Sequence, residues 1–452
     1  MDIHAGAVPA RRSVDVSAAS FSDAAAFGVL LVSVVAIPVT FSIANPDVFA
    51  MPKTIVAVGL AVVLLGLLGV RAATHRGSGP ELVREPLAWA VGGFAAWTAL
   101  ATIFSVDPGR SLVGEPRQFQ GLGTTLAYTV YLAAGWTTVR TPRRRTMLLV
   151  AAAVAAGIVS TYAVIQGANL DPIWTDLDDE RAFSTIGQAN ALAAYLVIAV
   201  PLTLALAIGR SLPVQAGVTA LAILELVALA FTLSRGGFLG IGVAAVVLIA
   251  LLWRRHREVI SRHAVAIVAV AAVASAALVL LVPDLRAGAE RAVDRVLRPG
   301  SVEEASTSAH LDQWAVGLAI ALDHPLVGTG PETYPRMFDA YRDEVIDDSE
   351  RAEMWKRYRP ESPHNHYLAI AGGAGLPALA AYLALIAITA WRASRILPAA
   401  DRRTLVFGAC VLAAIAGHLV TDGFMTAETT GSVLFWTLLG VAAAMRPATS
   451  GS

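Results

Sequence analysis

Long uninterrupted apolar runs constrain this chain more than any other feature. A hydrocarbon core of about 30 Å is crossed by about 20 apolar residues of helix. Runs that meet or approach this length lie near 24–44, 53–70, 87–104, 122–139, 146–166, 189–209, 212–233, 237–253, 264–282, 364–390, 404–421 and 430–446. Because backbone groups in lipid need internal partners, and no alternating strand pattern is present, each run is expected to be helical. The sequence therefore predicts an all-α polytopic membrane protein with about twelve spans.

The composition agrees with a membrane protein. The 452 residues are 56% hydrophobic and 15% charged, whereas a soluble chain of this length would divide into domains with charged surfaces. The net charge is zero, so no global field recruits nucleic acid and no such partner is expected. The single cysteine, Cys410, lies in an apolar run and excludes a disulfide within the chain.

The distribution of basic residues predicts the orientation. Nineteen of the 34 Lys and Arg residues fall in the termini and in short loops on the same side, and five fall in short loops on the other side. By the positive-inside rule, both termini are cytoplasmic. The expected division is a tail over 1–23, a membrane domain over 24–446 with an extracytoplasmic cap at 283–363, and a tail over 447–452. The cap is the loop between spans nine and ten.

Apolar residues at helical spacing predict helices in the cap, which we expect to lie on the membrane surface. The stripes are Leu285, Ala289, Ala292, Val293, Val296 and Leu297, then Leu311, Trp314, Ala315, Leu318 and Leu322, then Tyr334, Phe338 and Tyr341. Within the spans, Pro38, Pro201 and Pro377 are expected to kink helices.

Two arginines near the outer boundary are candidates for binding phosphate. Arg235 lies in a Ser-Arg-Gly-Gly turn between two spans, where glycines allow a close backbone approach and an Arg fork suits phosphate oxygens. The alternative is an Arg that reaches lipid headgroups. Arg181 precedes a span and follows five acidic residues, so a local salt bridge is its alternative. Arg117, with Gln120 three residues on, is a similar but weaker candidate.

Histidines at the start of the tenth span are candidates for proton transfer. His364, Asn365 and His366 follow Pro363, where the long loop returns to the membrane. Histidine moves protons near neutral pH, and two histidines two residues apart on a helix face different ways. We therefore expect only one of them to meet the substrate. Asn365 could orient the ring or cap the helix, and a bland interfacial histidine is the alternative reading.

Glu225 and the acidic loop are less specific. Glu225 lies about 15 Å deeper than Arg235 on a straight helix, as a paired structural carboxylate or as part of a proton path. Asp176 and Asp178 spell an acid-x-acid pattern, but general loop acidity explains them better. No His, Cys or Glu cluster has metal-ligand spacing, so no metal site is expected.

Five motifs occur in an order that resembles the O-antigen ligase superfamily of ligases, related polymerases and some protein oligosaccharyltransferases. They lie at 117–122, 181–190, 234–237, 324–331 and 363–368. The resemblance covers roughly residues 90–390. One departure is His310, where relatives often carry an arginine, which weakens a binding role there.

The resemblance implies a metal-independent, inverting glycosyltransferase of the bacterial cytoplasmic membrane, with its active site facing outward and no cofactor. The donor would be a glycan on undecaprenyl diphosphate, and the acceptor a glycan, lipid or protein. Arg181 and Arg235, with Arg117, Gln120 and Asn365, would bind substrate. His364 would act as the catalytic base.

Other functions remain open from the sequence. A polymerase that extends a chain would differ from a ligase only in its acceptor. A flippase or transporter would also have about a dozen spans, but it should show internal repeats and cations near the midplane, not cations at one face.

Overall fold

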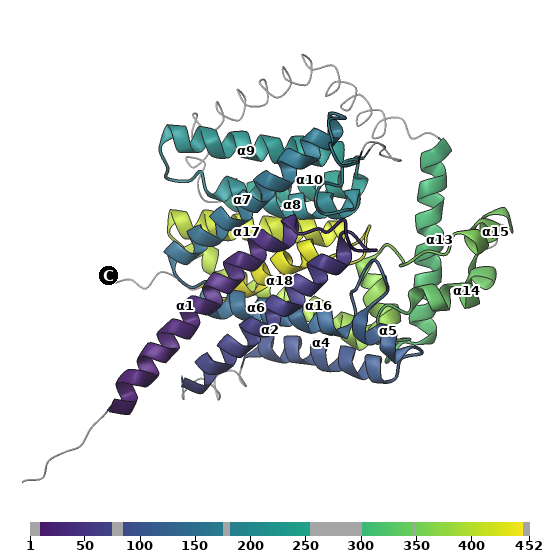
Figure 1. Ribbon diagram of the computed structural model, residues 1–452, viewed down its shortest axis with the longest axis horizontal. Coiled ribbons are helices and arrows are strands. Elements are labelled where there is room, and N and C mark those ends of the chain that lie inside the picture. The colour runs from purple at the N-terminus through teal and green to yellow at the C-terminus, as the bar shows by residue number, and fades with distance from the viewer. Residues whose placement is uncertain (1–9, 75–84, 175–180, 254–300, 347–348, 446–452) are drawn as a thin grey trace, which may run out of the picture.

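The computed structural model describes the chain except for residues 1–9, 75–84, 175–180, 254–300, 347–348 and 446–452. Within this part, every regular element is a helix, and most helices run side by side in a bundle (Figure 1). Eight of the described helices are long and apolar enough to cross a membrane. They are α1 (Ala10–Val39), α2 (Ala50–Thr74), α4 (Pro86–Ile103), α7 (Pro142–Gly167), α9 (Leu212–Phe231), α10 (Arg235–Trp253), α16 (His366–Ile396, continued by η1, Leu397–Ala399) and α17 (Arg402–Thr421). The chain is therefore a helical membrane protein.

Eleven of the twelve predicted spans coincide with described helices. Three of these helices are shorter: α6 (Leu122–Thr138), α8 (Ala189–Ala205) and α18 (Thr429–Ala443). The predicted span at 264–282 lies outside the described residues. The all-helical class is confirmed for the described part, while the count of twelve spans and the sidedness of the loops stay predictions.

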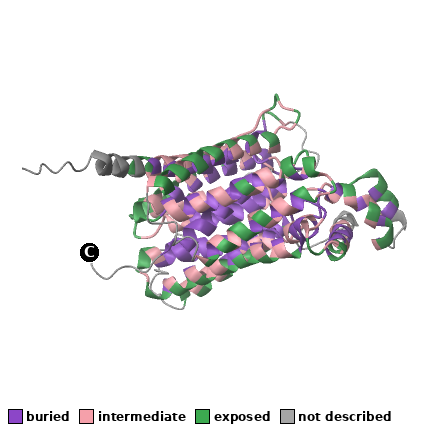
Figure 2. Ribbon diagram, turned by 90° about the horizontal axis from the view of Figure 1, so that it is seen from below, coloured by how far each residue is buried: buried purple, intermediate pink, exposed green. Residues whose placement is uncertain are grey.

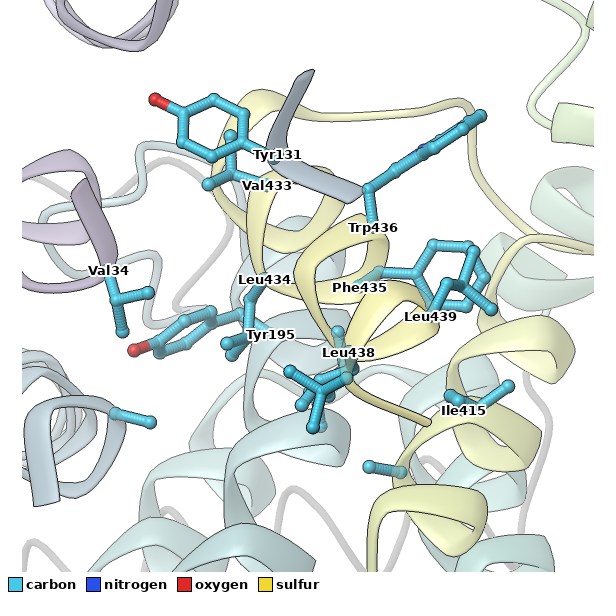
Figure 3. Packing of buried hydrophobic residues seen from close by; sticks show 14 of the residues in the cluster. Val34, Tyr131, Tyr195, Ile415, Val433, Leu434, Phe435, Trp436, Leu438 and Leu439 are labelled. Carbon is cyan, nitrogen blue, oxygen red and sulfur yellow. The ribbon is translucent and has the colours of Figure 1, made fainter. Parts of the chain in front are cut away.

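The two short apolar helices α8 and α18 form the centre of the bundle. Almost every residue of each is buried, whereas α2, α4, α9 and α10 leave much of their apolar surface uncovered. A helix that is apolar all round belongs inside a larger bundle. Figure 3 shows α18 residues such as Phe435 and Leu438 packed among Tyr131, Tyr195 and Ile415. Figure 2 shows the same buried interior along the length of the bundle.

Close backbone contacts hold α10 against α17. A Cβ added to Gly240 would lie 2.9 Å from the carbonyl oxygen of Gly417, and one added to Gly417 would lie 2.8 Å from that of Gly240. Small residues of this kind allow membrane helices to approach closely, since apolar burial gives little drive between helices in lipid. The N-terminal end of α10 is thereby fixed beside the C-terminal end of α17.

Helix α16 is broken at Gly375, which has φ 82° and ψ 167°. The predicted kink at Pro377 is thus a break two residues earlier. Pro377 has no N–H to give the carbonyl of Gly373, so that oxygen accepts instead from Gly330 N at 2.8 Å. The freed carbonyl of Gly372 accepts from Thr329 N at 2.9 Å.

The loop 324–331 completes this break from outside the helix. Leu376 N donates to the carbonyl of Pro325 at 2.8 Å, and Trp97 Nε1 donates to that of Leu326 at 2.8 Å. A Cβ on Gly375 would collide with the Leu326 carbonyl, so only glycine fits. Backbone hydrogen bonds therefore join loop 324–331 to the broken α16, and the Trp97 side chain joins the same loop to α4. The Gly-Thr-Gly sequence thus has a structural use.

Three helices of the predicted cap lie beyond one end of the bundle. They are α13 (Ser301–Asp323), which runs across the bundle direction, α14 (Tyr334–Val345) and α15 (Ser349–Arg357) (Figure 1). Their shared apolar cluster includes Val316, Ile320, Phe338 and Trp355, and Trp355 Nε1 donates to Asp312 at 3.1 Å. The leucines of the second predicted stripe, Leu311, Leu318 and Leu322, lie outside this cluster.

Three leucines of that second stripe are exposed on α13, while Trp314 is half-buried. The side chains of Leu311, Leu318 and Leu322 are 55%, 50% and 64% exposed. An uncovered apolar stripe is what a helix lying on a membrane surface would show, and that placement stays a prediction. The first stripe, 285–297, lies outside the described residues. The third is confirmed as a helix by α14.

Candidate functional site

Arg235 is the first residue of α10 and follows a tight turn. Leu233 has φ 50°, and the side chain of Ser234 accepts a hydrogen bond from Gly237 N at 3.3 Å. A Cβ on Gly237 would lie 2.7 Å from the Cβ of Ala193 in α8. The glycines therefore allow the close approach that the sequence predicts, and they fix the backbone that carries Arg235.

Arg181 is held against the same turn. Its Nε donates to the carbonyl of Thr232 at 2.8 Å, and its Nη2 donates to Asn190 Oδ1 at 2.6 Å. The next residue, Ala182, donates its N–H to the carbonyl of Phe231 at 3.0 Å. The guanidinium thus has a defined orientation between α8 and the α9–α10 turn.

The salt-bridge alternative for Arg181 concerns five acidic residues. One of them, Asp171, accepts hydrogen bonds from Tyr162 at 3.0 Å and from Gln166 at 2.8 Å. The other four lie outside the described residues. Asp171 therefore has other partners within the described part of the chain.

Both arginines line one cavity of about 270 Å³, which we call the arginine cavity. It is lined by Arg181, Asn190, Leu233, Ser234, Arg235, Gly236, Gly237, His310, Leu311, Trp314, Thr421, Phe424 and Met425. No acidic side chain is among these residues. Two guanidinium groups in a partly enclosed site, with aromatic walls, favour a ligand with phosphate-type oxygens.

His310 joins this cavity to His364. Their ring centroids are 5.4 Å apart and their planes differ by 29°. Burial, and then the nearby Arg235, lower the pKa of His310. Burial, and then His310, lower the pKa of His364 to about 4. Both rings are therefore neutral at pH 7 and can accept a proton or a hydrogen bond.

Two residues of this site were not predicted to bind substrate from the sequence. The absence of the usual arginine weakened the expectation for His310, yet its side chain lines the cavity, with a buried Nδ1 that has no partner among the described residues. Asn190 closes the motif 181–190, but its hydrogen bond to Arg181 is visible only in the structure. For Asn190 the available signal was its place in the motif 181–190, and for His310 it was the position at which relatives often carry an arginine.

The backbone of segment 362–368 places the two histidines differently. His364 has φ 47°, a left-handed conformation, just before α16 begins. Asn365 Oδ1 accepts from Leu368 N at 3.1 Å, so of its two predicted roles the structure shows the helix cap. Its Nδ2 also donates to the carbonyl of Gly423 at 3.2 Å.

His366 and Gln120 line a second cavity, together with Tyr128, Glu332 and Trp436. The ring of His366 packs edge-on against Tyr382, with centroids 5.4 Å apart. Gln120 accepts from Tyr128 Oη at 2.6 Å and donates to Thr429 at 3.1 Å. Neither side chain is in the wall of the arginine cavity.

The structure does not bring Arg117 or Glu225 into the arginine cavity either. The side chain of Arg117 is 79% exposed and forms an ion pair with Glu361 at 3.2 Å. Glu225 is fully buried in α9 and accepts from Thr203 Oγ1 at 2.7 Å, while its Oε2 has no partner among the described residues. The Thr203 contact fits the structural-carboxylate reading of Glu225.

No group of three or more His, Cys, Asp or Glu side chains in the described part of the chain could hold a metal ion. Asp176 and Asp178 lie outside that part. The positive charge at this site comes from the guanidinium groups of Arg181 and Arg235.

Comparison with known protein families supports the resemblance noted above. Residues 220–383 match the family model described as O-antigen ligase. This segment contains Arg235, His310 and His364, while Arg117 and Arg181 lie before it. A search of curated proteins found no match. The match over residues 220–383 therefore supports the O-antigen ligase superfamily that the motifs of the chain resemble.

Proposed function

We propose that this protein transfers a glycan from an undecaprenyl-diphosphate donor to an acceptor hydroxyl or amide at the outer face of the bacterial cytoplasmic membrane. One observation carries the proposal: Arg181 and Arg235 line a single cavity with His310, and His364 stacks on His310. Cationic groups for a leaving diphosphate thus lie beside a neutral base.

The arginines would act on the bond that breaks. The hydroxyl oxygen or amide nitrogen of the acceptor attacks the anomeric carbon of the donor sugar, and the bond from that carbon to the diphosphate oxygen breaks with inversion. Negative charge grows on the leaving diphosphate, where guanidinium donors held in advance stabilise it. Two hydrogen bonds, to the Thr232 carbonyl and to Asn190, hold the Arg181 guanidinium in place before the donor binds. A metal ion is not required for this stabilisation.

His364 would accept the proton of the attacking acceptor group. Burial keeps its pKa at about 4 in the free protein, so its lone pair is available at neutral pH. A bound diphosphate brings negative charge close to the ring and favours its protonated form. The base therefore becomes stronger when the donor is in place.

The acceptor is a glycan, a lipid or a protein, and the chemistry is the same for a ligase and for a chain-extending polymerase. Membership of the superfamily supports both. The arginine cavity concerns the donor, which the two reactions share.

The test combines a transfer assay with a donor-binding assay on purified protein. Arg235→Ala should lose donor binding and transfer, and Arg235→Lys should recover little because an ammonium lacks the bidentate fork. His364→Ala should lose transfer but still bind donor. Arg117→Ala is the matched control: its exposed ion pair contributes about 0–1 kcal/mol, so it should keep most activity.

Three results would count against these assignments. Full activity of Arg235→Lys would show that no bidentate contact exists there. Loss of donor binding in His364→Ala would make that residue a diphosphate ligand. An inactive His366→Ala beside an active His364→Ala would move the base to the second cavity.

A further inference from the structure

A second cationic cavity lies far from the arginine cavity. Thr404 and Phe407, near the start of α17, line it, whereas Thr421, at the end of the same helix, lines the arginine cavity. The helix between Thr404 and Thr421 is about 25 Å long at 1.5 Å per residue. The two cavities therefore lie at opposite ends of the bundle and are separate sites.

This cationic site, which we call the basal cavity, has a volume of about 440 Å³. It is lined by Pro142, Arg143, Arg145, Thr146, Leu149, Ala205, Leu206, Ile208, Arg210, Asp401, Arg403, Thr404 and Phe407. Its four arginines come from the start of α7, the turn after α8 and the start of α17. A run of arginines that only sets membrane orientation has no need to converge on a cavity from three segments.

The four basal arginines make no ion pair with a carboxylate of the described residues. Neighbouring cations differ: Arg71 and Arg144 both pair with Asp23, at 2.9 and 2.5 Å. The one acid in the cavity wall, Asp401, accepts from Arg403 N at 3.3 Å as the cap of α17. The cavity thus has an excess of positive charge.

Arg145 places a buried hydrogen-bond donor in the wall of this cavity. Its guanidinium lies over the ring of Phe407, 5.4 Å from the centroid, which fixes its direction. Its Nε is buried and has no hydrogen-bond partner among the described residues. A buried donor without a partner is costly, and an anionic oxygen in the cavity would satisfy it.

The setting suits a lipid headgroup. Helices α7 and α17 both begin at this cavity, so their N-terminal N–H groups and dipoles add to the positive potential. Both helices are candidate membrane spans, so their first turns lie where headgroups meet the apolar core. Leu149, Leu206 and Ile208 in the wall offer apolar contact for acyl chains.

We propose that the basal cavity binds the phosphate headgroup of an anionic phospholipid, with Arg145 and Arg403 as its main ligands. Arginine pockets between membrane helices recognise such headgroups through charge and through paired N–H donors. The bound lipid would tie the α8–α9 turn to the starts of α7 and α17.

The test measures lipid binding to the full-length purified protein by native mass spectrometry, with phosphatidylglycerol and phosphatidylcholine as probes. Wild-type protein should bind phosphatidylglycerol at least tenfold more tightly than it binds phosphatidylcholine. Arg145→Gln and Arg403→Gln should each weaken that binding about tenfold. Arg402→Gln is the matched control, because Arg402 is the neighbouring exposed arginine outside the cavity wall. The affinity of this variant for phosphatidylglycerol should stay within twofold of the wild-type value.

Several outcomes would overturn the proposal. Equal affinity of the wild type for both lipids would show no headgroup selection, and this result needs no variant to fold. An Arg403→Gln protein that binds like Arg402→Gln would exclude the cavity as the site. Complete displacement of phosphatidylglycerol by millimolar inorganic phosphate would reassign the cavity to a free anion. If Arg403→Gln is unstable, Arg403→Lys replaces it, with weaker binding expected.

Discussion

Replacing Asn190 by alanine should weaken transfer without removing any charge from the site. The perturbation removes the acceptor that holds Arg181 Nη2 at 2.6 Å, while the contact from Nε to the carbonyl of Thr232 remains. A hydrogen bond to a charged group contributes about 1.5–3 kcal/mol. With about 1.4 kcal/mol for each factor of ten, kcat/KM should fall about 10- to 150-fold.

The assay is the initial rate of transfer from a lipid-linked donor, with donor binding measured in parallel. Asn190→Asp is the informative companion, because it keeps the shape but adds a carboxylate that competes with the diphosphate for Arg181. It should weaken donor binding more than alanine does. The double variant Arg181→Lys, Asn190→Ala should lose less kcat/KM than the two single losses combined predict, since both changes remove the same Arg181–Asn190 contact. A folded Asn190→Ala protein with kcat/KM within threefold of wild type would refute the reasoning.

Three further predictions concern pH, metals and topology. Since the catalytic form of His364 is neutral and burial holds its pKa at about 4, the acid limb of kcat/KM should lie well below pH 6.5. The limb of kcat should lie at higher pH because bound diphosphate raises this pKa, and a kcat/KM limb at or above 6.5 would contradict the assignment. Activity should survive EDTA, and loss with recovery by a divalent ion would return Asp176 and Asp178 to the site. Ser308→Cys, in a protein with Cys410 replaced, should react with an impermeant maleimide from outside intact cells, and labelling only after permeabilisation would reverse the predicted orientation.

The helices were predictable because spans follow from apolar run length alone. Their ends were less so: the run at 189–209 gave a helix that stops at Ala205, before a turn in which Gly209 has φ 65°. The break in α16 depends on a partner loop about 45 residues earlier in the chain. Pro377 indicated a disturbance, but only the position of loop 324–331 shows why the break occurs at Gly375.

Site residues were predictable where one local turn determines their position. The glycines after Arg235 indicated a tight backbone approach, and the structure has one. Arg117 has φ 76° and is directed to the exposed ion pair with Glu361, which no local pattern specifies. His310 and His364 are 54 positions apart, so their stacking depends on how α13 crosses the start of α16.

The backbone junction between loop 324–331 and α16 limits how the cap of this protein can be exchanged for that of another. Pro325, Thr329 and Gly330 complete a membrane helix with main-chain groups. A cap exchanged at 283 and 363 would therefore bring a foreign loop against resident Gly372 and Gly373. Side-chain redesign cannot repair a main-chain mismatch. A productive chimaera should instead keep 324–331 with its own α4 and α16, and exchange only the outer helices α14 and α15.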